Sequence, residues 1–376
     1  MRLLMVSGDR QVTIGERGPF HSMQREFSRH FERIDVLCPR PERAVEVRTI
    51  HENVHFHPAE CSRWGMVGYI RRRGRELIEA HAHSLIVSHD YGWFYNGLGS
   101  ARLARATGVP YLSELHHVPG HPVAVDLGER IEYGLARAYV RWARSRAAAF
   151  RVVNAGEMPA LLERWGVSAE RVLVLPSLYI DLAVFHPEPQ AAFDQDLCSV
   201  GRMVRNKGME RIIVALALCK ERGRRVTALL VGKGPLEAAL RSRVARLGLE
   251  EEVRFVRWVE SPEELALLYR RSRLMVCAST CEGGPRVTVE AMACGTPVVS
   301  TPVGQMSELL GDGALGRLCG FDSESLASVV SEVLGDEPRR RSMGERAAEV
   351  ATRFEYAHTI GLYADGLKAL ARGGGA

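Results

Sequence analysis

Two glutamates with seven residues between them mark the stretch of this sequence that is best suited to chemistry. Glu282 precedes the turn Gly283-Gly284-Pro285, and Glu290 lies about two turns into the helix that we expect to follow. A glycine-rich turn that opens a helix presents backbone N–H groups at the positive end of the helix dipole, which favours an anion. The two carboxylates can accept hydrogen bonds from sugar hydroxyl groups. The stretch therefore predicts a site for a phosphorylated ligand rich in hydroxyl groups.

A second loop supplies cations that suit a diphosphate. Gly201-Arg202 ends one predicted strand, and Lys207-Gly208 opens the helix after it. Arginine offers a planar fork of donors and lysine a point charge, and both bind phosphate oxygens. Only four lysines occur in the chain, so a lysine in a loop is informative. A solvated basic loop is the alternative, and the glutamate motif favours the phosphate site over it.

Other loops carry weaker signals. Gly232-Lys233-Gly234 lies between a predicted strand and helix, where glycine permits a close approach of backbone to ligand, although a plain turn fits equally well.

In the first half, His89-Asp90 and His116-His117 each end a predicted strand. An imidazole there can contact a phosphate, a leaving group or an acceptor, and His116 is the stronger candidate.

Three further patterns resemble known ligand or metal sites, but their sequence context argues against each of them. The Gly311–Gly316 segment matches GxGxxG, but it follows a helix and opens none, so we reject it as a dinucleotide site. Asp194-Gln195-Asp196 reads as a polar strand entry. The histidines at 51, 55 and 57 lack a nearby carboxylate trio, so we expect no metal site.

The elements that must position these residues alternate between strand and helix in two blocks. Predicted strands are Leu3–Ser7, Arg33–Cys38, one or two within Val45–Phe56, Ser84–Ser88, Val109–Leu115, Ala147–Val153, Val172–Pro176, Leu197–Val200, Val226–Val231, Val253–Val256, Leu274–Ala278 and Val298–Thr301. Alternation of this kind predicts parallel sheets covered by helices. With Pro187–Ala192 as the linker, the fold class is α/β: two doubly wound Rossmann-like domains facing a cleft, with ligands at the carboxyl ends of the strands.

Composition narrows the class of protein. The chain has 376 residues, 46% of them hydrophobic and 25% charged, with a net charge of +5. No concentrated basic face is evident, so nucleic acid is not an expected partner. The eight cysteines form no CxxC pair, which is typical of reduced core cysteines in a cytoplasmic protein. No apolar run is long enough to cross a membrane. The basic stretch Arg71–Arg75 leaves peripheral contact with the inner face of the plasma membrane as an alternative to a solvated helix face.

These motifs together resemble the GT-B glycosyltransferases of family 4. The matching segments are Glu282-x7-Glu290 with the following EAMACGTPVVST, Gly201-Arg202-x4-Lys207-Gly208, the loop Val231–Pro235, TPVGQMSELL and LPSLYIDLAVFHP. The resemblance implies an acceptor-side domain at 1–186, a donor-binding domain at 187–353, and a final helix at 354–376 that crosses back to the first domain.

The resemblance also implies residue roles. Arg202 and Lys207 would bind the donor diphosphate, Glu290 the ribose hydroxyls, and Glu282 the transferred sugar. His116 would lie near the reacting sugar, so the implied catalytic set is His116, Glu282, Arg202 and Lys207. The remaining implied donor contacts are Gly18, Gly232, Gly234, Arg257, Gly283, Gly284, Pro285, Arg286 and Val287.

Three positions depart from the family pattern. Ser177 and Leu178 replace the usual Asn-Gly, Arg257 replaces a glycine, and the paired glycine loop near the N-terminus is reduced to Gly15 and Gly18. The diphosphate and Glu-x7-Glu residues are all present, which favours an active enzyme.

The implied activity is retaining, metal-independent hexosyl transfer. The donor would be a UDP-sugar or GDP-sugar as co-substrate, with no cofactor, and the acceptor a hydroxyl group of a glycan or lipid-linked glycan in envelope polysaccharide or glycolipid synthesis. A nucleotide-sugar epimerase of the same fold and a non-catalytic nucleotide-sugar binding protein are the alternatives. The sequence does not indicate the oligomeric state.

Overall fold

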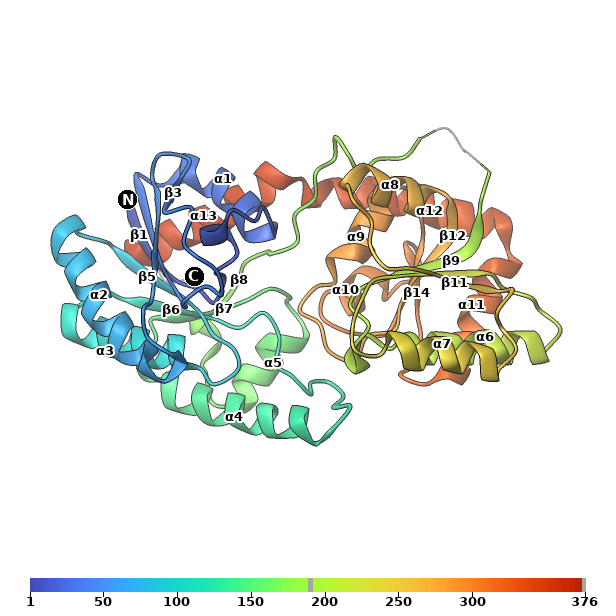
Figure 1. The fold of residues 1–376 in the computed structure, drawn as a ribbon, viewed down its shortest axis with the longest axis horizontal. Coiled ribbons are helices and arrows are strands. Elements are labelled where there is room, and N and C mark those ends of the chain that lie inside the picture. The colour runs from blue at the N-terminus through green and yellow to red at the C-terminus, as the bar shows by residue number, and fades with distance from the viewer. Residues whose placement is uncertain (189–191, 374–376) are drawn as a thin grey trace. The chain divides into compact units, whose positions relative to one another are not determined.

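The computed structural model describes residues 1–188 and 192–373, so residues 189–191 of the predicted linker lie outside the described part. The chain divides into two compact units (Figure 1). Unit 1 comprises residues 1–118, 131–177 and 357–376, and unit 2 comprises residues 119–130 and 178–356. The boundary lies at 177/178, where the sequence predicted 186/187. The final helix groups with unit 1.

The sheet of unit 2 is parallel throughout and has the order β11-β10-β9-β12-β13-β14. Its strands are β9 (Gln195–Val200), β10 (Ala228–Val231), β11 (Val253–Val256), β12 (Ser272–Cys277), β13 (Val298–Ser300) and β14 (Gly316–Leu318). In sequence order this is 3-2-1-4-5-6, the doubly wound arrangement, and the direction of winding reverses between β9 and β12. The sequence analysis did not predict β14, which has only three residues.

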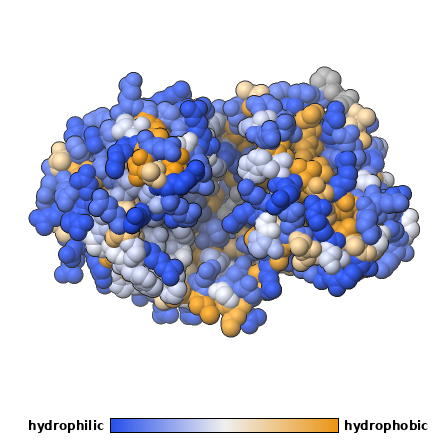
Figure 2. All heavy atoms as spheres, viewed as in Figure 1, coloured by the Kyte–Doolittle hydropathy of each residue, from blue (hydrophilic) through white to orange (hydrophobic). Residues whose placement is uncertain are grey.

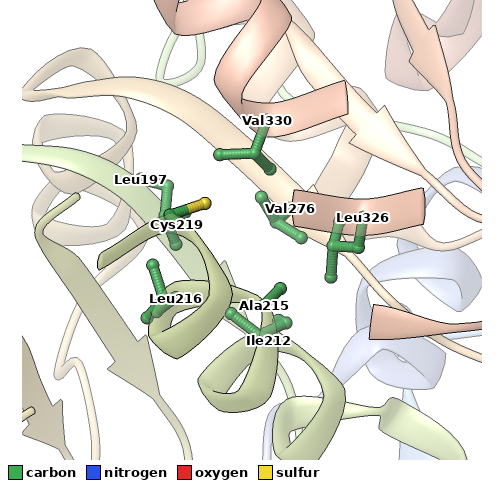
Figure 3. A pocket seen from close by; sticks show the side chains of 8 residues that line it. All are labelled: Leu197, Ile212, Ala215, Leu216, Cys219, Val276, Leu326 and Val330. Carbon is green, nitrogen blue, oxygen red and sulfur yellow. The ribbon is translucent and has the colours of Figure 1, made fainter. Parts of the chain in front are cut away.

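Helices cover both faces of this sheet (Figure 1). One face packs α6 (Met209–Glu221), α7 (Glu237–Arg246) and α11 (Ser323–Gly335); the other packs α8 (Pro262–Arg270), α9 (Arg286–Ala293) and α10 (Met306–Leu310), with α12 (Glu337–Ala351) contributing to both. Figure 3 shows apolar side chains of α6 and α11 meeting Leu197 and Val276 of the two central strands. The gap between them has no room for a water molecule, so it is packed core that fixes the strands carrying the site loops.

Unit 1 has the same design with one strand more at each side. Its sheet has the order β3-β4-β2-β1-β5-β6-β7-β8, with only the β3–β4 pair antiparallel among its described pairings. The strands are β1 (Arg2–Val6), β2 (Arg33–Cys38), β3 (Thr49–Ile50), β4 (Val54–Pro58), β5 (Leu85–His89), β6 (Tyr111–Glu114), β7 (Ala149–Val152) and β8 (Val172–Val174). The helices are α1 (Pro19–His30), α2 (Met66–His81), α3 (Tyr95–Thr107), α4 (Leu127–Ala143), α5 (Glu157–Arg164) and α13 (Tyr356–Ala371). The predicted α/β class with two Rossmann-like domains is confirmed.

The face of the molecule drawn in Figure 2 is mainly polar. Hydrophilic residues cover most of the face in Figure 2, and hydrophobic residues form scattered patches on it. Among the described residues, no helix combines the length and hydropathy that a membrane span requires.

Candidate functional site

The strand order of unit 2 brings the two predicted site loops together. β9 and β12 are adjacent, with Leu197 opposite Leu274 and Cys198 opposite Met275. The loop that begins at Gly201 and the loop that begins at Ala278 therefore leave the same edge of the sheet side by side. This is the point where the winding reverses, and open α/β sheets bind ligands there.

Glycines allow the loops at this edge to touch backbone to backbone. Gly232 has φ +146°, and a Cβ on it would lie 1.8 Å from the carbonyl oxygen of Gly201; a Cβ on Gly234 would lie 2.5 Å from the carbonyl oxygen of Met203. Gly208 has φ +68° and would place a Cβ 2.0 Å from the carbonyl oxygen of Ala278. These positions admit only glycine. Gly232 and Gly234 thus fix the loop that carries Arg202 and Lys207.

Lys207 and Glu282 are in direct contact, although 75 residues separate them. Lys207 Nζ donates to Glu282 Oε1, and Ser279 Oγ donates to the same oxygen at 2.9 Å. The Lys207 side chain is 24% exposed and that of Glu282 is 15% exposed, so both reach the surface of the site. Their charges offset each other, and the contact fixes the lysine in one place.

The other basic residues at this edge are exposed. Within the described residues, the Arg202 guanidinium has no side-chain hydrogen bond or ion pair, so it is available to an anion. Arg257 donates from Nε to Glu237 at 3.0 Å and is 72% exposed. Lys233 Nζ lies 4.9 Å from the centre of the exposed Trp258 ring.

Glu290 points largely into unit 2. Its side chain is 10% exposed; Oε1 lies 3.4 Å from Arg286 Nε, and Tyr269 donates to Oε2 at 3.3 Å. Burial raises the pKa of Glu290, and the charge of Arg286 opposes the shift. Arg286 also donates to the Tyr179 carbonyl oxygen at 2.8 Å and stacks on the Tyr179 ring. Tyr269 and Tyr179 carried no signal in the sequence, because each reaches this helix from a distant segment.

The turn between the two glutamates packs closely against Gly304 and Leu178. Gly304 has φ +52°, and a Cβ on it would lie 2.2 Å from the carbonyl oxygen of Gly283. A Cβ on Gly284 would lie 3.0 Å from Leu178. The helix α9 then begins at Arg286, after Pro285, with no side chain capping its N-terminus, and Val287 packs on the core. The N-terminal N–H groups of α9 are thus not taken by a capping side chain.

In unit 1, His116 lies over a buried charge cluster. Glu114 and Arg151 are almost fully buried and lie 3.2 Å apart, and His89 Nε2 lies 3.2 Å from Glu114 Oε2. His116 Nε2 lies 3.3 Å from Arg151 Nη1 and 3.6 Å from Glu114 Oε2, and its side chain is 47% exposed. Tyr363 of α13 donates to Glu114 Oε1 and lies under the Arg151 guanidinium at 3.6 Å.

This cluster holds Glu114 ionised. Burial alone would raise the pKa of Glu114, but Arg151, His89 and His116 together bring it well below its usual range. Burial lowers the pKa of His89 to about 4. The neighbouring Asp90 accepts hydrogen bonds from Ser88, Ser113 and Tyr139, and burial raises its pKa to about 7. The half-exposed His116 is thus the solvent-facing member of a buried network.

The remaining predictions concern Gly18 and the histidines that the sequence analysis weighed as metal ligands. Gly18 stands at the N-terminus of α1, before Pro19, with extended backbone. His55 contacts Thr49, and His57 and His83 both contact the buried Asp35, at 2.7 and 2.8 Å. In the described part of the chain no group of three histidine, cysteine or acidic side chains is placed to hold a metal ion.

Two family models cover most of the chain. The model described as a glycosyl transferase 4-like domain matches residues 20–177, and the model described as glycosyl transferases group 1 matches residues 187–350. The structure is similar to that of Anabaena Alr3699/HepE in complex with UDP and glucose, with a TM-score of 0.74, 21% identity, and coverage of 98% of this chain and all of that one.

Curated relatives are also similar to the chain. A D-inositol 3-phosphate glycosyltransferase of Nocardia farcinica is 34% identical over 55% of this chain and 49% of its own length. D-inositol 3-phosphate glycosyltransferase 1 of Catenulispora acidiphila is 31% identical over 73% of this chain and 70% of its own length. The predicted resemblance is confirmed: the chain belongs to the GT-B glycosyltransferases of family 4.

Proposed function

We propose that this glycosyltransferase moves a hexose from a UDP-sugar or GDP-sugar to a hydroxyl group, with retention and without a metal ion. The donor assignment rests on the contact between Lys207 and Glu282 at the reversal point of the unit 2 sheet, on a loop that also carries the exposed Arg202. The similar Anabaena structure, described as a complex with UDP and glucose, supports a nucleotide-sugar donor.

The main barrier of the proposed reaction is the negative charge that develops on the leaving diphosphate, and the basic residues of this site can stabilise that charge. The acceptor oxygen bonds to the anomeric carbon, while the bond from that carbon to the diphosphate oxygen breaks and its electron pair leaves with the diphosphate. The acceptor proton passes to the diphosphate on the same face. Negative charge therefore grows on the leaving group. Arg202 and the fixed charge of Lys207 stabilise that charge, as preorganised donors do in an oxyanion hole.

The two glutamates have separate tasks in this proposal. Glu282 lies beside Lys207, so it accepts hydrogen bonds from hydroxyls of the sugar next to the diphosphate. Glu290 lies deeper, oriented by Arg286 and Tyr269, and its accessible edge takes the ribose hydroxyls.

Unit 1 contributes His116 on the acceptor side. Arg151 and Glu114 offer its Nε2 a donor and an acceptor side by side. The ring is therefore held in one place whether Nε2 accepts from Arg151 or donates to Glu114.

The acceptor is the least defined partner. The names of the curated relatives specify inositol 3-phosphate, a polyol phosphate. We place such a compound first among acceptors to test, ahead of the glycan or lipid-linked glycan that the family resemblance implied.

A two-stage experiment tests the proposed function. UDP-sugars and GDP-sugars are first screened for an increase in melting temperature, and the best ligand is then incubated with inositol 3-phosphate while diphosphate release and product configuration are followed by NMR. Release that depends on acceptor, with retained configuration, supports the proposal. Conversion of the donor without acceptor would indicate an epimerase, and binding without any turnover a non-catalytic protein.

A further inference from the structure

A cavity of about 590 Å³ opens in unit 1 at the carboxyl ends of β1, β2 and β4. Its walls come from the loops after these strands and from the start of α2 and α3. The lining residues are Gly8, Arg10, Pro39, Arg40, Pro41, Cys61, Ser62, Arg63, Met66 and Tyr95. The volume suits a small molecule. The strand order also reverses between β1 and β5, so the cavity lies near the favoured ligand position of this sheet.

All the charged side chains that line this cavity are positive. The lining includes three arginines and no carboxylate. Two cavities of similar size in unit 2 differ, because one is lined in part by Glu188 and Glu345 and the other by Glu210. The polar groups of Ser62 and Tyr95 complete a set of donors around the cavity.

Two of the arginines have no acidic partner. Arg10 pairs with Glu42 and donates to the Arg40 carbonyl oxygen at 3.4 Å. Within the described residues, neither Arg40 nor Arg63 forms a side-chain ion pair, and both are exposed. Guanidinium groups without an acidic partner, beside an open pocket, favour an anion that can take paired hydrogen bonds, such as a phosphate ester.

Exposed aromatic rings lie next to these arginines. Trp64 is 74% exposed and Trp93 is 58% exposed, and their rings are 6.4 Å apart. The Arg63 guanidinium lies 5.0 Å from the centre of the Trp64 ring, which holds it in place. Large exposed tryptophans are uncommon on a surface without a binding role and offer flat faces for a ring-shaped ligand.

We infer that this cavity binds the phosphate group of a phosphorylated acceptor, with Arg40 and Arg63 as its main ligands. The inference rests on the proposed function, because it names the substrate class of the same enzyme. It separates the two anions of the reaction: the donor diphosphate belongs to unit 2 and the acceptor phosphate to unit 1.

A charge-matched pair of variants tests the inference. Arg40→Gln/Arg63→Gln removes two charges from the cavity, and Arg102→Gln/Arg105→Gln removes two exposed charges from α3 that do not line it. Titration of the full chain with inositol 3-phosphate and with inorganic phosphate is followed by calorimetry. We expect the first variant to weaken both affinities about tenfold or more, and the second to stay within about twofold. UDP affinity should be the same in all three proteins.

Vesicles distinguish the source of the phosphate. Sedimentation with phosphatidylcholine vesicles, with and without phosphatidylinositol phosphate, is measured for the same three proteins. Binding to the phosphorylated vesicles that only the cavity variant loses would assign the site to a lipid headgroup, and its absence to a soluble acceptor. The calorimetric titration decides whether the phosphate site exists, and the vesicles decide only the source of its phosphate.

Equal affinity for inositol 3-phosphate in the two variants would overturn the inference. So would inhibition of transfer by inorganic phosphate that competes with the donor and not with the acceptor. If wild-type protein binds no nucleotide sugar, the proposed function fails instead, and the phosphate titration still reports on the cavity. Because Arg40 and Arg63 are exposed, the variants should fold, and Arg40→Gln alone serves as a milder form.

Discussion

Lys207 and Glu282 form an ion pair that joins the loops after β9 and β12, the two central strands of the unit 2 sheet. The pair keeps a cation at the point where a donor diphosphate is proposed to bind. It also means that the diphosphate must share Lys207 with a carboxylate. Affinity and catalysis therefore depend on Glu282 in opposite directions.

Glu282→Gln should separate these two effects. The amide can still accept from Ser279, but it no longer offsets the charge of Lys207. We expect UDP to bind up to about fivefold more tightly, the scale of a partly exposed ion pair. Transfer should slow, because the sugar loses a charged acceptor. Glu263→Gln, on the exposed side of α8, is the control, and calorimetry with steady-state kinetics gives both quantities. Weaker UDP binding by Glu282→Gln would contradict the assignment.

Tyr363→Phe should disturb the cluster beneath His116. Removing the hydroxyl takes a hydrogen bond from the buried, ionised Glu114 and should cost about 1–3 kcal/mol of unfolding free energy. A double-mutant cycle with Glu114→Gln, followed by denaturant unfolding, measures the coupling between the two residues. Additive changes in unfolding free energy would show that the contact between Tyr363 and Glu114 does not stabilise the fold. A changed pH profile of transfer in Glu114→Gln would further tie the cluster to His116.

His89 should make stability dependent on pH. Burial lowers its folded pKa from 6.5 to about 4, so below pH 6.5 the unfolded chain binds this proton more readily than the folded one. The contribution of His89 is complete above pH 6.5 and decreases toward pH 4, by up to about 3 kcal/mol. His89→Gln should flatten the curve of unfolding free energy in this window, and the exposed-site control His186→Gln should not. Parallel curves for wild type and His89→Gln would refute the prediction.

Transfer should continue in the presence of EDTA. In the proposed reaction, Arg202 and Lys207 supply the positive charge that stabilises the leaving diphosphate. We expect the initial rate of diphosphate release to change by less than about twofold, since the charge stabilisation comes from fixed side chains. Loss of activity in EDTA that magnesium or manganese restores would contradict metal independence.

The sequence predicts the fold and the loops better than the contacts between them. Alternating apolar strands and helices give both sheets, because a buried parallel strand needs a continuous apolar run such as Leu274–Cys277. The short β14 escaped prediction because a three-residue strand has no usable period. The loops at 201–208 and 282–290 were recognisable because each combines glycines with charged residues directly after a predicted strand, which is a local pattern.

Long-range pairs were beyond sequence reasoning. Lys207 and Glu282 are 75 residues apart and Glu114 and Tyr363 are 249 apart, and no local pattern specifies such distances. Glu290 illustrates the same limit. Its spacing from Glu282 was evident, but its burial against Tyr269 depends on how α8 packs on α9. The arginine-lined cavity combines three separate loops, and none of them has a distinctive motif.

The most direct test of the account compares Arg202→Ala and Lys207→Ala with the control Lys220→Ala in a diphosphate-release assay with the preferred nucleotide sugar. Neither site residue is part of the core, so all three proteins should show the circular dichroism spectrum of the wild type. We predict that both site variants lose about two to three orders of magnitude in turnover, as is usual when a preorganised charge at a leaving group is removed, while Lys220→Ala retains wild-type activity. Wild-type turnover by folded Arg202→Ala and Lys207→Ala would contradict the assignment of this edge of the unit 2 sheet as the donor diphosphate site.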